Sequence, residues 1–193
     1  MYAKVENNVI VKANSSLASF NRAAPSWSAE QLAANGIYEV VYDNTNLKDD
    51  RFYINGAESF TFANDTVTAS YAAATGKALD DVNEVDEDGN ALLDDDGVQM
   101  VTSGLKSHEK NKIKVQAAGQ LQSTDWYIVR HAEATTAIPA DVSTFRTAIR
   151  TKSNEIETSI DGASTVEALE ALFTYTTGAD DVVSRPLGEW PKL

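Results

Sequence analysis

The spacing of apolar residues changes near residue 104, and this change constrains the fold more than any other feature of the chain. Before it, short apolar runs alternate with turn-forming pairs such as Asn7-Asn8 and Asn64-Asp65. After it, apolar residues recur every three or four positions, at Val142, Phe145, Ile149, Ile156 and Ile160. The first pattern indicates short antiparallel strands and the second indicates amphipathic helices. The sequence therefore predicts an α+β fold with a β-rich domain over 1–79, an acidic arm over 80–104 and about three helices over 105–193.

The N-terminal domain is expected to be an antiparallel β meander with one short helix. Asn7-Asn8, Asn55-Gly56 and Asn64-Asp65 are residue pairs that tolerate positive φ angles, as tight hairpin turns require. Ser28 and Gln31 have the spacing of a capping box, which predicts the start of the short helix. The residues expected in the core or at an interface are Phe52, Ile54, Phe60, Phe62, Val67 and Tyr71.

The acidic arm combines a high density of carboxylates with two turn signals. Residues 80–96 contain nine carboxylates and no basic residue. Two acidic, glycine-containing clusters, over 86–90 and 94–97, flank the short apolar run 91–93. This pattern predicts a β-hairpin that projects from the body, with residues 98–101 as its returning strand. We identify no internal repeat in the chain.

The arm also resembles part of a calcium-binding loop. Asp86, Asp88 and Asn90 alternate as the first ligands of a helix-loop-helix calcium site do. The sixth position, which needs glycine, is Ala91, and the twelfth, which needs glutamate, is Gly97. We therefore interpret Asp86, Asp88, Asp94 and Asp96 as charged turn residues, with a looser ion site among them as the alternative. No metal and no cofactor is predicted.

The charge balance narrows the classes of partner. The formal net charge is −13, and such a chain repels phosphate backbones and anionic lipid surfaces, so neither nucleic acid nor a membrane is an expected partner. By contrast, residues 106–152 carry eight basic residues and four acidic ones. Solvated surfaces explain both stretches; alternatively, the acidic stretch of one subunit meets the basic helices of another. The absence of cysteine fits a reducing compartment and excludes thiolate chemistry.

Arg130-His131 resembles the motif of histidine phosphatases, in which an arginine and a histidine flank the reacting phosphoryl group. That family needs a second histidine far downstream, whereas the only other histidine here, His108, precedes His131. About 60 residues follow His131, too few for an alternating strand-helix fold. We therefore predict that the chain is not an enzyme and keep a phosphatase that uses His131 as a remote alternative.

Two stretches resemble proteins of tailed bacteriophages. The opening residues 1–11, with 22–25 and 32–38, resemble the N-terminal part of small tail proteins of marine phages. Residues 105–150, with Gly104 before them, resemble tail assembly chaperone or tail-fibre assembly segments. The matching residues of that second stretch are Gly104, Leu105, Lys106, Ser107, Leu121, Thr124, Asp125, Trp126, Arg130, Glu133, Ile138, Pro139, Arg146, Ile149 and Arg150.

The resemblance implies a non-enzymatic protein of the phage tail. The resemblance leaves two roles open, because some such proteins remain on the particle and others act as transient assembly chaperones. We expect a virion component that binds other tail or tail-fibre subunits and is assembled in the host cytoplasm, with the transient chaperone as the alternative; a homo-oligomer is compatible with both. Trp126, Phe145, Arg146 and Arg150 are the candidate partner-binding residues. We expect Trp126 to pack between the helices predicted over 106–122 and 139–160, and the two arginines to pair with Asp125, Glu133 or a partner's carboxylates.

Overall fold

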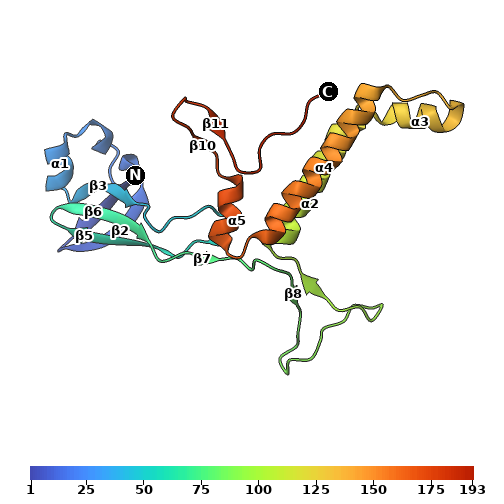
Figure 1. Ribbon diagram of the computed structural model, residues 1–193. Coiled ribbons are helices and arrows are strands. Elements are labelled where there is room, and N and C mark those ends of the chain that lie inside the picture. The colour runs from blue at the N-terminus through green and yellow to red at the C-terminus, as the bar shows by residue number, and fades with distance from the viewer. The chain divides into compact units, whose positions relative to one another are not determined.

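The computed structural model describes residues 1–193 and has the predicted α+β fold. Its contacts divide the chain into two compact units, Met1–Gly76 and Lys77–Leu193. The first unit contains the main sheet and the second contains the long helices (Figure 1). The division falls close to residue 79, where the sequence places the end of the β-rich domain.

The first unit is built around a five-stranded sheet with the strand order β2-β1-β3-β6-β5. The β1–β2, β1–β3 and β5–β6 pairs are antiparallel, whereas β3 and β6 are parallel. The sheet is therefore mixed, because the chain between β3 and β6 crosses over instead of returning directly. The elements of this unit are β1 (Tyr2–Glu6), β2 (Val9–Ser15), η1 (Leu17–Ser19), η2 (Ala24–Ser26), α1 (Ala29–Ala34), β3 (Ile37–Asp43), β4 (Tyr53–Ile54), β5 (Glu58–Ala63), β6 (Thr66–Tyr71) and β7 (Thr75–Gly76).

Several local predictions for this unit are confirmed. Asn7 and Asn8 have φ angles of 51° and 63° and join β1 to β2, as a two-residue hairpin turn requires. Asn64 and Asp65 join β5 to β6 in the same way. Ser28 and Gln31 form both hydrogen bonds of the capping box at the start of α1.

The prediction of a hairpin at Asn55-Gly56 is wrong. β4 pairs with β7 and β5 pairs with β6, so the strands on either side of Asn55 do not pair with each other. The Asn55 side chain instead accepts a hydrogen bond from the Lys48 amide at 2.8 Å and donates one to the Lys48 carbonyl at 2.9 Å. Asn55 therefore closes a loop, and Ile54 is 61% exposed instead of belonging to the core.

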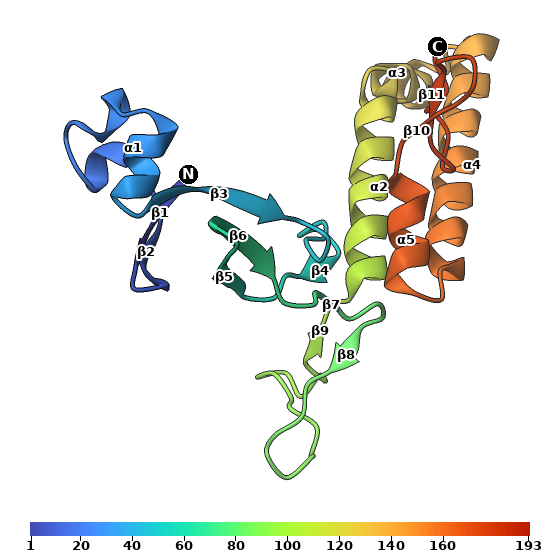
Figure 2. The same cartoon turned by 90° about the vertical axis from the view of Figure 1, so that its left-hand side faces the viewer.

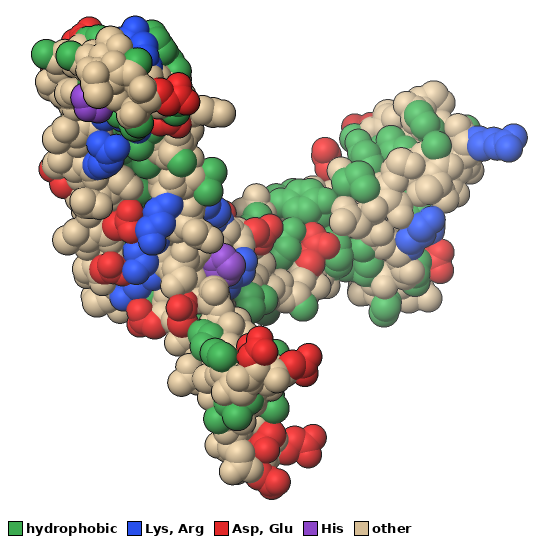
Figure 3. Space-filling model, turned by 90° about the vertical axis from the view of Figure 1, so that its right-hand side faces the viewer, with side chains coloured by type: hydrophobic (Ala, Val, Ile, Leu, Met, Phe, Trp, Pro, Cys, Tyr) green, Lys and Arg blue, Asp and Glu red, His purple; other side chains and the backbone are tan.

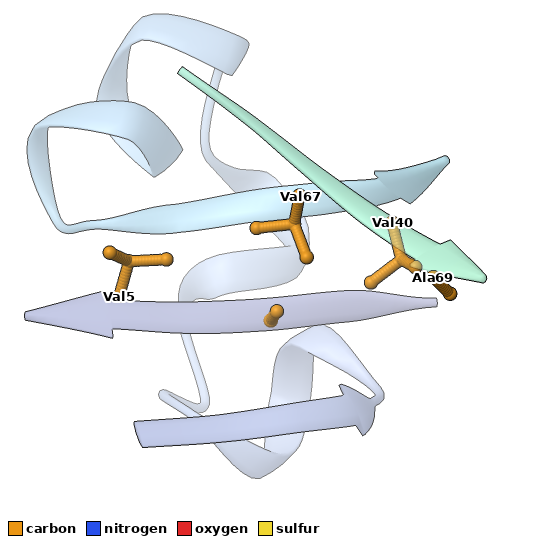
Figure 4. Close-up of a cluster of buried hydrophobic side chains, with 5 residues drawn as sticks. Val5, Val40, Val67 and Ala69 are labelled. Atoms are coloured by element: carbon orange, nitrogen blue, oxygen red, sulfur yellow. The ribbon is translucent and has the colours of Figure 1, made fainter. Parts of the chain in front are cut away.

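The core of the sheet is formed by small and β-branched residues. Ala3, Val5, Val40, Val67 and Ala69 form one buried cluster between neighbouring strands (Figure 4). Phe60 and Phe62 pack against this cluster and are partly buried. Phe52 is also buried, as predicted, whereas Tyr71 is half-buried.

The second unit is dominated by two long helices, α2 and α4, which lie side by side (Figure 2). Ala117 and Leu121, near the end of α2, contact Phe145 and Ile149, near the start of α4, so the pair is antiparallel. The buried residues of α4 include all five of the predicted stripe, which confirms the helical spacing. The elements of this unit are β8 (Val82–Asn83), β9 (Val101–Thr102), α2 (Leu105–Gln122), α3 (Asp125–Ala134), α4 (Ala140–Gly162), α5 (Val166–Phe173), β10 (Thr176–Thr177) and β11 (Val183–Ser184).

The C-terminal tail returns to this helix pair. Trp190 packs against the cluster of Ala117, Phe145 and Ile149. Its indole Nε1 donates a hydrogen bond to Gln116 Oε1 at 3.3 Å. None of the helices has the length and apolar character that crossing a membrane requires.

Candidate partner-binding site

Helix α3 forms the connection between α2 and α4 and contains no buried residue (Figure 1). Trp126, Ile128 and Val129 are all exposed, and the Trp126 side chain is 51% exposed. A helix that contributes nothing to the core and still presents large apolar side chains is typical of an interaction surface. The apolar residues of α3 are therefore the first part of the candidate site.

Arg130 holds the aromatic side chains of α3 in place. Its guanidinium carbon lies 4.5 Å from the centre of the Trp126 ring and 5.3 Å from that of Tyr127. The centroids of these two rings are 3.9 Å apart. A cation over an aromatic face contributes about 0.5–1 kcal/mol at an exposed site. The exposed indole is thus restrained before any partner binds, and the four-residue spacing of Trp126 and Arg130 was the sequence signal for this contact.

Arg146 fixes the corner at which α3 begins. Its Nη1 donates to the Leu121 carbonyl at 3.0 Å, to Thr124 Oγ1 at 2.7 Å and to Asp125 Oδ1 at 2.8 Å. Thr124 is buried as well, and its hydroxyl donates to the Leu121 carbonyl at 2.8 Å. A single buried side chain on α4 therefore connects the last turn of α2 to the first turn of α3.

The structure changes the roles of the predicted partner-binding residues. Trp126 is exposed, so the prediction that it packs between the two long helices is wrong. Phe145 and Arg146 are buried, so neither is available for direct contact with a partner: Phe145 packs with Ala117 and Ile149, and Arg146 positions the corner. Arg146 pairs with Asp125, one of the carboxylates considered from the sequence. Arg150, four residues further along α4, is exposed.

His131 has a local structural role. Its Nδ1 lies 2.9 Å from the Thr136 carbonyl, next to Thr135, whose φ of 49° ends α3. His108 lies near the start of α2, whereas His131 lies on α3, beyond the end of α2, so most of the length of α2 separates them along the chain. The structure therefore does not bring the two histidines together around one phosphoryl-sized site.

The acidic arm differs from the single hairpin predicted from the sequence. β8 and β9 are two residues each, and the segment between them contains two further bridges, Val85 with Ala91 and Leu93 with Gln99. These bridges are eight positions apart and belong to two copies of an eight-residue repeat, over 84–91 and 92–99. Each copy has an apolar residue at its second position followed by Asp-x-Asp-Gly. The expectation of no internal repeat is therefore corrected.

The two copies of the repeat have the same turn. Asp86 Oδ1 accepts from the amides of Asp88 and Asn90 at 2.9 and 2.8 Å. Asp94 Oδ1 accepts from the amides of Asp96 and Val98 at 3.0 and 2.8 Å. The hydrogen bond from the Asn90 amide, with smaller contributions from the Asn90 side chain and other amides, lowers the pKa of Asp86 below its usual value.

The repeat closes into a ring of backbone hydrogen bonds. Leu92 donates to the Glu84 carbonyl at 3.0 Å, Met100 donates to Leu92 at 2.8 Å, and Glu84 donates to Met100 at 2.8 Å. The Gln99 side-chain amide lies within 3.0 Å of all three carbonyl oxygens. This ring gives the arm a defined structure although no residue of 80–103 is buried.

The seven carboxylates over 84–96 divide into two groups. Asp86 and Asp94 fold the turns, and Glu84 accepts a hydrogen bond from the Thr102 hydroxyl. The other group, Glu87, Asp88, Asp95 and Asp96, consists of exposed side chains at the turn tips. The structure brings no three histidine, aspartate or glutamate side chains into positions that could hold a metal ion, so Asp86, Asp88, Asp94 and Asp96 do not form one cluster.

Most basic residues of the helical part are already paired within the chain. Lys110 Nζ lies 2.6 Å from Asp161, and this hydrogen bond raises the pKa of Lys110. The other ion pairs are Lys106 with Asp80, Lys112 with Glu109, Lys114 with Glu157 and Arg146 with Asp125. The helices are therefore less basic as a surface than the sequence of residues 106–152 indicates.

No family model, no curated protein and no solved structure matches the chain.

Proposed function

We propose that the protein is a structural component of a bacteriophage tail that is assembled in the host cytoplasm, becomes part of the virion and binds other tail or tail-fibre subunits. The resemblance of residues 1–11, 22–25, 32–38 and 105–150 to phage tail proteins suggests this role. The observation that carries the proposal is helix α3, which presents Trp126, Ile128 and Val129 to solvent while Arg146 holds its first turn against α2 and α4.

The physical basis is the free energy of burying this exposed apolar surface. Burial of a large apolar side chain stabilises by about 1.5–3 kcal/mol. Tryptophan is also the residue type most enriched among the energetically dominant positions of protein interfaces. Because Arg130 already restrains the Trp126 ring, little side-chain entropy is lost when a partner covers it. Helix α3 is thus suited to bind another subunit, or a second copy of the chain.

The decisive experiment compares purified phage particles with lysates of infected cells by quantitative mass spectrometry. We expect a fixed copy number of the protein per particle. A protein found with tail subunits in the lysate but absent from particles would instead be a transient assembly chaperone. A protein found with tail subunits in neither sample would contradict the proposal.

The role of α3 is tested in the same system with Trp126→Ala. We expect this variant to remain folded but to be depleted from particles. Val115→Ala, which shortens an exposed apolar side chain on α2, is the matched control and is expected to be incorporated normally. A phosphatase activity that His131→Ala abolishes in a folded protein would overturn the non-enzymatic proposal.

A further inference from the structure

We propose that residues 82–102 of the acidic arm are a docking surface for a partner protein whose contact face has an apolar centre surrounded by lysine and arginine. The inference extends the proposed function and rests on it only in requiring a partner subunit. It is carried by the repeat, by the apolar side chains that the repeat exposes and by the carboxylates beside them.

The apolar part of this surface follows the eight-residue period. Val85, Leu93 and Val101 occupy equivalent positions, one residue after each member of the hydrogen-bonded ring, and are 54%, 55% and 47% exposed. Val98 and Met100 lie in the same short segment and are exposed as well. Isolated exposed apolar residues are ordinary, but several of them gathered on one small ordered element indicate a contact surface.

The ring makes this surface suitable for binding. Glu84, Leu92 and Met100 donate to one another's carbonyls, and Gln99 donates to these carbonyls from its side chain. The two Asp-x-Asp-Gly turns fix the loops on either side. A segment that is already ordered loses less conformational entropy on binding than a flexible loop does.

The charges of the arm determine the chemistry of the partner. Residues 80–104 contain no lysine, arginine or histidine. The exposed side chains of Glu87, Asp88, Asp95 and Asp96 form no ion pair, and Figure 3 shows red and green side chains but no blue on the visible face of the arm. Opposite charges around an apolar centre steer association and exclude acidic partners.

A second copy of this chain is a poor match for this surface. Its own arm has the same negative charge, and five of the eight basic residues over 106–152 are already in ion pairs with carboxylates of the same chain. A sixth basic residue, Arg130, lies over the Trp126 ring. The geometry therefore favours a different, basic subunit as the partner.

The test measures binding of two synthetic probes to the full chain by isothermal titration calorimetry at low salt. One probe is an amphipathic helical peptide of leucine and lysine; the other is an oligolysine with the same charge. We expect the amphipathic peptide to bind at least about tenfold more tightly. Equal affinities for the two probes would overturn the apolar part of the proposal.

Two arm variants separate the contribution of the apolar side chains to binding from that of the carboxylates. In Val85→Thr/Leu93→Thr/Val101→Thr, which places the polar, β-branched threonine at all three positions, the affinity for the amphipathic peptide should fall to that for oligolysine. In Glu87→Gln/Asp88→Asn/Asp95→Asn/Asp96→Asn, both probes should lose at least about tenfold in affinity. Unchanged affinity in either variant would overturn the proposal.

Matched variants elsewhere complete the test. Val9→Thr/Val115→Thr changes exposed apolar residues outside the arm, and Glu39→Gln/Glu133→Gln/Glu155→Gln/Glu189→Gln removes the same number of charges. Both should bind the peptide within about twofold of the natural chain. Equal losses of affinity in these controls would mean that the probes bind by net charge alone.

Hydrogen exchange checks that each arm variant keeps its ring, because the Leu92 and Met100 amides should still exchange slowly with solvent. Because the probes are synthetic, the result is independent of the particle inventory.

Discussion

Arg146 and Asp125 form a hydrogen-bonded ion pair at 2.8 Å although they lie 21 positions apart in the chain. The arginine is buried on α4, whereas the aspartate is largely exposed at the first turn of α3. The same Nη1 also reaches Leu121 and Thr124, so the pair belongs to a small network at the corner between helices. This network determines the direction in which α3 leaves the helix pair, and thereby where Trp126 is presented.

The first prediction concerns this network. Arg146→Ala should lower the free energy of unfolding by about 2–4 kcal/mol, because the Leu121 carbonyl and the Thr124 hydroxyl lose a buried partner. Arg150→Ala, on the exposed side of the same helix, should change it by less than about 0.5 kcal/mol. Urea denaturation followed by circular dichroism measures both, and equal effects would show that the network does not stabilise the corner.

The helix interface gives a second prediction. Ile149 is 0% exposed and packs with Phe145 and Ala117. Ile149→Ala should therefore destabilise the second unit by about 2–5 kcal/mol through the lost burial and the cavity that remains. The same denaturation experiment on Val129→Ala, an exposed position on α3, should show a change below about 1 kcal/mol. A smaller loss for Ile149→Ala than for Val129→Ala would contradict the helix packing.

A third prediction tests the ring of the arm. Gln99→Glu removes the side-chain amide donor and places carboxylate oxygens against three carbonyl oxygens, so the ring should open. We expect the Leu92 and Met100 amides to exchange at least about tenfold faster with solvent, while the amides of α2 and α4 are unaffected. Gln120→Glu, an exposed change on α2, serves as the control. Unaltered exchange at Leu92 in Gln99→Glu would mean that Gln99 does not hold the ring.

The pKa of Asp86 leads to a fourth prediction. Because the folded-state pKa is lower than the unfolded value of about 3.9, ionised Asp86 stabilises its turn above that value. This stabilisation is lost as the pH falls through the lower, folded-state pKa. The Asn90 amide resonance should therefore stay constant from about pH 7 to pH 5 and shift at more acidic pH. Nuclear magnetic resonance of Asp86→Ser, in which a neutral hydroxyl replaces the carboxylate, should show no such shift; a transition near neutral pH would point to another group.

Local sequence signals predicted the secondary structure well where the residues that decide it are neighbours in the chain. The Asn7-Asn8 turn and the Ser28 capping box depend on a few adjacent residues, and both are present. The Asn55-Gly56 prediction failed because its turn propensity competed with a side-chain hydrogen bond to Lys48 and with the pairing of β4 to the distant β7. Propensity alone cannot rank these alternatives.

The candidate site was harder to predict for the same reason. The sequence identified residues 124–150 as one region but assigned burial by residue type, so Trp126 was expected inside. The eight-residue repeat of the arm is present in the sequence as the recurring Asp-x-Asp-Gly. The structure that it forms, however, depends on backbone hydrogen bonds among Glu84, Leu92 and Met100. Such bonds join residues eight and sixteen positions apart, which no helical or strand period indicates.

The sequence by itself determined the α+β class and the buried stripe of α4, because both follow from the spacing of apolar side chains along the chain. Only the tertiary structure decided that Arg146 is buried and that Trp126 is exposed. The reason is that burial depends on which surfaces the packed helices leave uncovered, and α2 and α4 bury their apolar stripes against each other. This pairing leaves α3 outside the core.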